Sequence, residues 1–150
     1  MDKSVFIPQR SCDLERIYRF LCKVDSSFVP SLASRVDIRQ YADKLSKKAC
    51  NIFLTCDQEG DVAHVALYLN SDSAFITSVA VLAAARGNGL ARILMNEALI
   101  IAKSSGCKSV SLEVEKSNYV AQNLYQSYGF FQTPEDAAIN QIIMKTTINE

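Results

Sequence analysis

A single stretch decides the fold: Arg86-Gly87-Asn88-Gly89-Leu90-Ala91, which joins two segments of opposite character. Residues 74–81 before it are rich in the β-branched side chains typical of a strand, and residues 90–103 favour a helix. The two glycines allow a tight turn and let a ligand approach main-chain N–H groups. The helix adds unpaired N–H donors and the positive end of its dipole. The sequence therefore predicts an anion site, typically for a phosphate, at this junction.

Two common phosphate-binding loops do not fit this stretch. A P-loop places Lys and then Ser or Thr after its last glycine, whereas Leu90 and Ala91 follow Gly89 here. A dinucleotide-binding turn needs a third glycine three residues after the second, where Arg92 stands. On these six residues alone, a glycine-rich turn without a ligand remains open.

A second motif lies downstream, in residues 110–130. Residues 110–115 (Val-Ser-Leu-Glu-Val-Glu) alternate in polarity and indicate a strand. Asn118 is a typical N-cap for the short helix that follows, and Gly129 is a typical helix stop. The pattern therefore predicts a strand, a capped helix and a glycine-terminated turn, in that order.

Both motifs resemble those of the GNAT N-acetyltransferase superfamily. Its first pattern, Gln/Arg-x-x-Gly-x-Gly/Ala, is matched by Arg86, Gly89 and Ala91. Its second, Leu-Glu-Val followed by Asn-x-x-Ala-x-x-Leu-Tyr-x-x-x-Gly-Phe, is matched at every defined position within residues 112–130. The resemblance implies an α/β (α+β) GNAT fold, a mixed central sheet with helices on both faces, in which two splayed parallel strands bind acetyl-CoA.

The resemblance also implies acetyl-CoA as co-substrate, bound largely by main-chain groups. The strand end would pair with the pantetheine amides and the turn would hold the diphosphate. Arg86 is either a phosphate contact or a plain loop residue. Asn118 would contact the cofactor in addition to capping the helix. The implied cofactor-binding residues are Val79, Ala80, Val81, Arg86, Gly87, Asn88, Gly89, Leu90, Ala91 and Asn118.

For catalysis, the resemblance implies direct attack of an amine on the thioester. Tyr125, the tyrosine of the second motif, would be the general acid that protonates the leaving thiolate. Glu113 would be the base, often through water, although a solvated glutamate is an equal alternative. His64, the only histidine, is either a base or a packed strand residue.

The composition limits the remaining possibilities. The 150 residues, 49% hydrophobic and 21% charged, indicate one globular domain, 1–150. Sixteen basic residues balance sixteen acidic ones, so we expect no nucleic-acid partner. Five scattered cysteines without a Cys-x-x-Cys pair predict buried, reduced thiols and no metal site. We expect a cytoplasmic protein without a membrane segment, because neither a signal-peptide core nor an apolar run of membrane length is present.

The periodicity predicts the element order β-α-α-β-β-β-α-β-α-β-β, beginning with a strand over residues 5–7 that ends before Pro8. The first helix is expected from Leu14 to Val24, and the second after an N-cap at Asp37. Near the end, Ile142-Ile143-Met144 is either a dimer-forming strand or an ordinary core strand.

From these features we expect an N-acetyltransferase that acts on a primary amine of a small molecule. Residues 28–45 should supply the acceptor pocket, and a faint likeness there suggests an amino-sugar nucleotide. One alternative is a protein N-terminal or lysine acetyltransferase, although no acidic run marks this segment. Another is an acyl-CoA-binding sensor without turnover.

Overall fold

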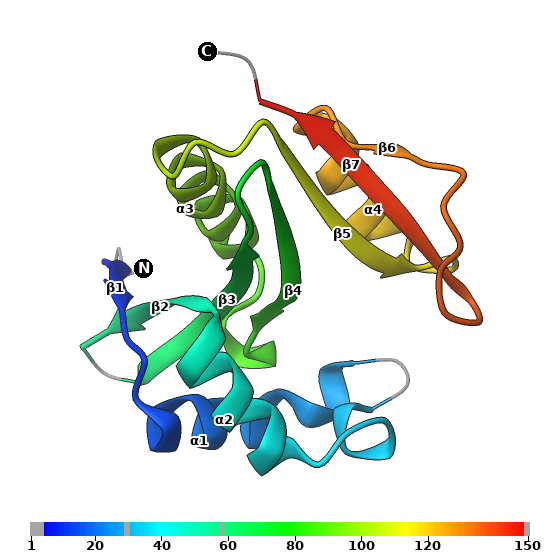
Figure 1. The fold of residues 1–150 in the computed structure, drawn as a ribbon. Helices are drawn as coiled ribbons and strands as arrows, with labels where there is room; N and C mark the ends of the chain where they lie inside the picture. The colour runs from blue at the N-terminus through cyan, green and yellow to red at the C-terminus, as the bar shows by residue number, and fades with distance from the viewer. Residues whose placement is uncertain (1–4, 29–30, 58, 149–150) are drawn as a thin grey trace. The chain divides into compact units, whose positions relative to one another are not determined.

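The computed structural model describes residues 5–28, 31–57 and 59–148 (Figure 1). It confirms the predicted order of strands and α-helices, with short 3₁₀ helices added at η1 (Asp25–Ser27), η2 (Leu32–Ser34) and η3 (Ala83–Ala85). The main elements are β1 (Ile7–Arg10), α1 (Leu14–Val24), α2 (Ile38–Lys48), β2 (Cys50–Cys56), β3 (Gly60–Leu69), β4 (Ser73–Val81), α3 (Leu90–Ser104), β5 (Ser109–Glu115), α4 (Tyr119–Ser127), β6 (Phe131–Gln132) and β7 (Gln141–Thr147).

The strands form one mixed sheet in the order β1-β2-β3-β4-β5-β7-β6. β4 and β5 run parallel, with the register Ser73↔Ser109 to Ile76↔Leu112. β1 pairs with β2, and β7 with both β5 and β6, in antiparallel fashion. The predicted fold class is confirmed, with the expected parallel pair at β4 and β5.

The chain divides into two compact units, and the boundary passes through β3, β4 and α3. The first unit comprises Met1–Ala66 and Ser78–Glu97, and the second comprises Leu67–Thr77 and Ala98–Glu150. The glycine turn therefore belongs to the first unit, whereas β5 and α4 belong to the second.

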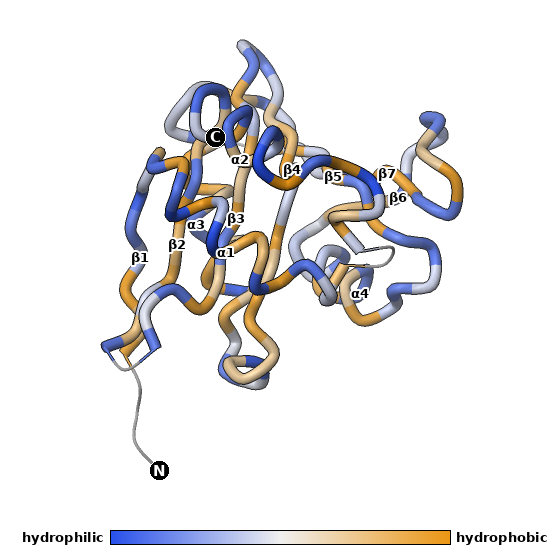
Figure 2. Tube along the Cα trace, turned by 90° about the horizontal axis from the view of Figure 1, so that it is seen from below, coloured by the Kyte–Doolittle hydropathy of each residue, from blue (hydrophilic) through white to orange (hydrophobic). Residues whose placement is uncertain are grey.

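In the first unit, both N-terminal helices begin where the sequence predicts. Asp13 caps α1 by accepting a hydrogen bond from the N–H of Arg16, and Asp37 caps α2 by accepting one from the N–H of Gln40. Their apolar residues are buried together with those of β2 and β3, which Figure 2 colours mostly as hydrophobic. Burial of apolar side chains at helical spacing stabilises this core.

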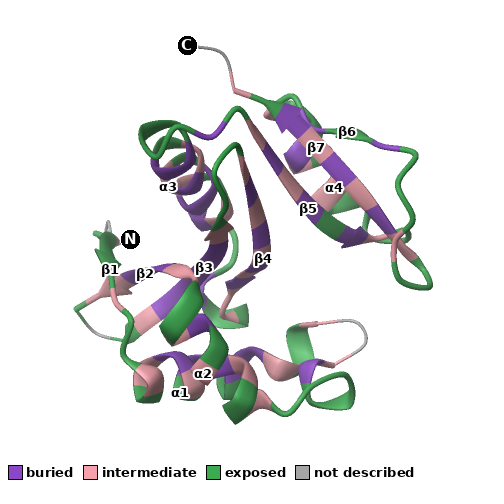
Figure 3. Ribbon diagram, viewed as in Figure 1, coloured by how far each residue is buried: buried purple, intermediate pink, exposed green. Residues whose placement is uncertain are grey.

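In the second unit, burial along β5 and β7 alternates residue by residue, as Figure 3 shows. Helix α4 ends at Ser127 with Tyr128 as its C-cap, and Gly129 follows with a φ of 87°. A Cβ at Gly129 would lie 3.1 Å from Oγ1 of Thr146, so both the backbone and the neighbouring strand favour glycine. The predicted glycine stop is confirmed.

The first strand differs from the prediction. β1 runs through Pro8, which lies opposite Leu54 in the register, instead of ending before it. β1 is an edge strand, and proline is tolerated there because its missing N–H need not join the ladder. Our rule that the strand stops at a proline is therefore wrong here.

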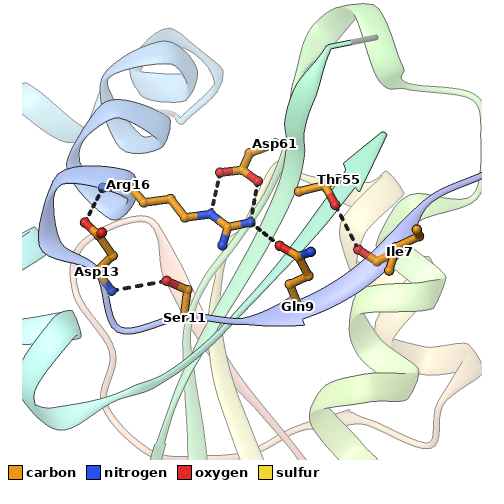
Figure 4. A network of polar contacts seen from close by, with 7 residues as sticks. All are labelled: Ile7, Gln9, Ser11, Asp13, Arg16, Thr55 and Asp61. Atoms are coloured by element: carbon orange, nitrogen blue, oxygen red, sulfur yellow. Dashed lines mark hydrogen bonds and ion pairs between the residues drawn. The ribbon is translucent and has the colours of Figure 1, made fainter. Parts of the chain in front are cut away.

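Arg16 joins three segments of the first unit (Figure 4). Its guanidinium donates to both carboxylate oxygens of Asp61 at 2.7 and 2.6 Å, and to Oε1 of Gln9 at 3.0 Å. The same group lies 4.3 Å from the centre of the Phe53 ring. The two parallel charge-assisted bonds to Asp61 fix the orientation of α1 against β3, and the bond to Gln9 links α1 to β1.

The cysteines also differ from the prediction. Cys107 is buried, but Cys12 and Cys22 are exposed, and Cys50 and Cys56 are half-buried. Cys12 lies beside a polar turn and Cys22 on the outer side of an amphipathic helix, so an apolar neighbourhood in sequence did not imply burial. All five are free thiols in this structure.

Candidate active site

The turn after β4 has the backbone conformation that its glycines predict. Gly87 and Gly89 have φ angles of 85° and 71°, in the left-handed region. A Cβ built on either would meet nothing within 4 Å. Glycine is therefore favoured here by the backbone conformation and not by lack of space.

The turn presents its main chain at an exposed surface. Residues 86–89 are exposed, and Asn88 braces the turn by donating from Nδ2 to the Ala85 carbonyl at 2.8 Å. The first intrahelical bond of α3 runs from the N–H of Ile93 to the Gly89 carbonyl. The N–H groups of Leu90 and Ala91 precede that bond, at the positive end of the helix dipole. This geometry suits an anion such as a diphosphate.

The side chain of Arg86 makes a local contact. Its Nη2 donates to Oγ of Ser27 at 3.0 Å, and the residue is exposed. The guanidinium is thus held beside the end of η1, while it keeps further donors for a phosphate. Both interpretations of Arg86 remain predictions.

The strand end preceding the turn alternates as expected, with Ala80 buried and Val79 and Val81 half-buried. The sequence reasoning missed Ser78, whose Oγ is buried and has no hydrogen-bond partner among the described residues. The sequence contains a sign of this, because Ser78 lies between Ile76 and Ala80 on the face of the strand that alternation predicts to be buried. A buried hydroxyl of this kind requires a partner.

In the second unit, Asn118 is the N-cap of α4, as predicted. Its side chain accepts a hydrogen bond from the N–H of Ala121 at 3.1 Å. Tyr119, the first residue of α4, is 69% exposed.

Tyr125 lies on the buried side of α4, with 9% of its surface exposed. Its ring centre is 6.0 Å from that of Phe130. Burial disfavours the phenolate and raises the pKa of Tyr125 to about 12. The hydroxyl therefore keeps its proton at neutral pH and can serve as a donor.

Glu113 projects from the exposed face of β5, together with Ser111 and Glu115. The residues between them, Leu112 and Val114, are buried, so the predicted division of the strand into two faces is confirmed. Water reaches the Glu113 carboxylate directly.

His64 is buried completely and is held by Asn51. Its Nε2 lies 3.0 Å from Oδ1 of Asn51, whose amide nitrogen donates to the carbonyls of Leu45 and Ala49. Because those two carbonyls fix the amide orientation, Nε2 of His64 carries the proton and Nδ1 does not. No described group bonds to Nδ1. Burial lowers the pKa of His64 to about 3, and the site is closed to substrate. His64 is a packed residue and not a base.

The described part of the chain offers neither a cluster of metal ligands nor a membrane-spanning helix. Within residues 5–28, 31–57 and 59–148, no three His, Cys, Asp or Glu side chains gather as metal ligands would. None of the described helices has both the length and the apolar character needed to cross a bilayer.

Comparison with known proteins identifies the family. The model of the acetyltransferase (GNAT) family matches residues 14–130. The chain belongs to this family. GNAT enzymes of known structure share its fold: an N-acetyltransferase (paia) from Thermoplasma acidophilum, solved in complex with coenzyme A, superposes with a TM-score of 0.73 at 16% identity, covering 95% of this chain and 99% of that one.

Two further similar proteins are both named as acetyltransferases that act on an alanine of ribosomal protein S18. A putative [ribosomal protein bS18]-alanine N-acetyltransferase of Bacillus subtilis (strain 168) is 31% identical over 109 residues, which is 65% of this chain and 70% of the relative. The ribosomal-protein-S18-alanine N-acetyltransferase of Escherichia coli has the same fold, with a TM-score of 0.74 at 22% identity and 96% of each chain covered. The GNAT chain described here is therefore an acetyl-CoA-dependent N-acetyltransferase.

Proposed function

We propose that this GNAT enzyme acetylates the α-amino group at the N-terminus of a protein, with residues 79–91 binding acetyl-CoA and Tyr125 donating the final proton. This acceptor replaces the small-molecule amine that we expected from sequence. The observation that carries the choice is the relative 31% identical to this chain, which is named a putative [ribosomal protein bS18]-alanine N-acetyltransferase. Alanine has no side-chain nitrogen, so N-acetylation of an alanine takes place on its α-amino group.

The chemistry of the candidate bases supports an α-amine. His64 is sealed in the core, and Glu113 is an exposed carboxylate. An α-amino group has a pKa of about 7.7–8.0, so a sizeable fraction is neutral at pH 7.5 without help. A lysine side chain, with a pKa of about 10.4, needs roughly 4.6 kcal/mol to present its lone pair at pH 7, which is about 3–4 kcal/mol more than an α-amine needs. A site without a buried base therefore fits the α-amine better.

The proposed steps assign one task to each group. The turn at Gly87–Ala91 holds the diphosphate through main-chain N–H groups, and Asn118 adds a contact. The neutral amine attacks the thioester carbonyl, the new C–N bond forms, and the C–S bond breaks. The amine proton passes through water to the carboxylate of Glu113, the proposed acceptor. Tyr125 gives its proton to the leaving sulfur, which would otherwise depart as a thiolate.

The experiment compares acceptors that differ only in which amine is free. One peptide begins with alanine and lacks lysine, a second has a blocked N-terminus and one lysine, and a third sample is an amino sugar. Release of free CoA thiol and a mass gain of one acetyl group are measured for each. Acetylation of the first peptide alone supports the proposal, whereas turnover confined to the lysine peptide or the amino sugar contradicts it.

The pH dependence gives an independent check. For an α-amine, kcat/KM should rise with pH and level off near pH 8, because the acceptor is then neutral. For a lysine or another aliphatic amine, it should still be rising at pH 9.5. Tyr125 does not interfere in this range, because its pKa of about 12 keeps it protonated.

A further inference from the structure

The register of the β1–β2 ladder, continued past the end of β1, leads to two cysteines. The register runs from Ile7↔Thr55 to Arg10↔Ile52, so paired residue numbers add to a constant. The N–H of Ser11 donates to the Asn51 carbonyl at 3.2 Å, which continues the same register by one step. From this register we infer that one further step places Cys12 opposite Cys50. Figure 4 shows the turn through Ser11 into Asp13 that follows this ladder.

The pair falls at the ladder position that suits a disulfide. Hydrogen-bonded and non-hydrogen-bonded pairs alternate along an antiparallel ladder. Ser11 and Asn51 form a bonded pair, and Pro8, which has no N–H, falls on the other set together with Arg10 and Cys12. Residues in a non-bonded pair have Cα atoms about 4.5 Å apart and side chains on one face. This separation lies within the range of roughly 4.4–6.8 Å that disulfides span.

Electrostatics and exposure agree with that placement. Burial raises the pKa of the Cys50 thiol, the charge of Arg10 lowers it, and the Cys12 thiol raises it. The thiols of Cys12 and Cys50 therefore interact electrostatically. Cys12 is exposed and Cys50 half-buried, so a small oxidant can reach the pair.

We propose that Cys12 and Cys50 form a redox-sensitive pair, which closes to an intrachain disulfide when a low-molecular-weight disulfide is present. Cys12 immediately precedes Asp13, the N-cap of α1, and Cys50 immediately follows Ala49, the C-cap of α2. The bond would thus join the start of the α1–α2 hairpin to its end.

The exchange balances with oxidised glutathione as the oxidant. The thiolate of Cys12 attacks one sulfur of oxidised glutathione, forming a mixed disulfide and releasing one glutathione thiolate. The thiolate of Cys50 then attacks the Cys12 sulfur and releases the second glutathione. The protein loses two protons and two electrons as its disulfide forms, and the oxidant is reduced to two thiols.

The test oxidises the full chain with oxidised glutathione and maps its thiols after denaturation. We expect free thiols to fall from five to three, with loss of two hydrogens in the intact mass and a linked peptide containing Cys12 and Cys50. Because the disulfide lowers the conformational entropy of the unfolded chain over the whole α1–α2 hairpin, Tm should rise by roughly 5–10 °C. Dithiothreitol should reverse both changes.

Three variants decide the assignment. Cys12→Ser and Cys50→Ser should each abolish the linked peptide and the rise in Tm, while Cys22→Ser, at an exposed cysteine of α1, should keep both. The variants can be compared in their reduced forms to show that each is folded. A glutathione adduct on Cys12 without the linked peptide, or a linked peptide involving Cys22 instead, would overturn the proposal.

Discussion

Each compact unit buries a titratable side chain with a strongly shifted pKa, and burial shifts the two pKa values in opposite directions. His64 in the first unit and Tyr125 in the second are both kept neutral at pH 7, one with a pKa of about 3 and the other with a pKa of about 12. His64 is fully enclosed, lies 4.7 Å from the Phe53 ring centre and is hydrogen-bonded to Asn51. Tyr125 keeps a margin of exposed surface and belongs to a motif on α4.

The comparison teaches that a shifted pKa alone does not mark a catalytic group. Desolvation is the first cause of both shifts. Only a group that substrate can reach can use its neutral form in a reaction. We therefore expect Tyr125 to matter for turnover and His64 to matter for stability, and the predictions below can break this division.

The largest effect is expected for Tyr125→Phe. Removal of the proton donor should lower kcat by about 10²–10⁴-fold and leave Tm and the Kd for acetyl-CoA close to those of the wild type. Release of free CoA thiol at saturating substrates measures it. Tyr119→Phe, at the exposed tyrosine of the same helix, is the matched control and should be silent. Full turnover by Tyr125→Phe would remove the tyrosine from the mechanism.

The second effect concerns acid stability and His64. The unfolded chain protonates this histidine near pH 6.5, whereas the folded protein does so near pH 3, so the stabilisation is complete above pH 6.5 and is lost as the pH falls toward 3. Between pH 7 and 4.5, this group alone should remove about 3 kcal/mol from the free energy of unfolding.

Urea unfolding of the wild type and His64→Leu at several pH values isolates that contribution, because the carboxylates titrate in both proteins. His64→Leu should start less stable at pH 7, by about 1–3 kcal/mol, since it leaves Oδ1 of Asn51 without its donor. Its pH dependence should be shallower and its kcat per folded molecule unchanged. A large loss of kcat with normal stability would reverse the roles of the two residues.

The third effect, that of Gly89→Val, tests whether main-chain N–H groups of the glycine turn bind acetyl-CoA. Gly89→Val should raise the Kd for acetyl-CoA by roughly 10–30-fold, because a branched side chain strains the left-handed backbone and displaces the N–H groups. Turnover at saturating acetyl-CoA should change little. Gly60→Val is a matched control in the same unit, with a φ of 72° and equally open space around its Cβ. Gly60→Val should lower Tm to a similar degree without raising the Kd for acetyl-CoA.

The smallest effect is expected for Arg86→Gln. If the side chain adds one phosphate contact, the Kd for acetyl-CoA should rise by about three- to fivefold, and the rise should shrink at high salt. Ser27→Ala removes the acceptor that now holds Arg86 and should not weaken binding. Arg19→Gln, at another exposed arginine of the first unit, controls for the change in net charge. An unchanged Kd would make Arg86 a plain loop residue.

The sequence predicted best what depends on near neighbours in the chain. The predicted caps at Asp37 and Asn118 each bond to an N–H three residues ahead, so residue type and spacing suffice to foresee them. The alternating faces of β5 and the glycine stop at Gly129 are local in the same sense. Such features require no knowledge of the tertiary structure.

The failures concern contacts between distant parts of the chain. The passage of β1 through Pro8 depends on its place at the sheet edge, which no window of sequence reveals. The exposure of Cys12 and Cys22 likewise depends on what packs against them. The bond between Arg16 and Asp61 joins residues 45 positions apart.

Sequence by itself determined the family, the element order and the glycine turn, because backbone conformation, capping and periodicity act over a few residues. Only the tertiary structure decided that His64 is enclosed beside Phe20 and Phe53, that Tyr125 is buried with a raised pKa, and that β1 pairs with β2 in the register on which the proposed Cys12–Cys50 pair rests. The physical reason is that desolvation and cross-strand pairing depend on which distant segments meet, and solvent access sets what a side chain can do.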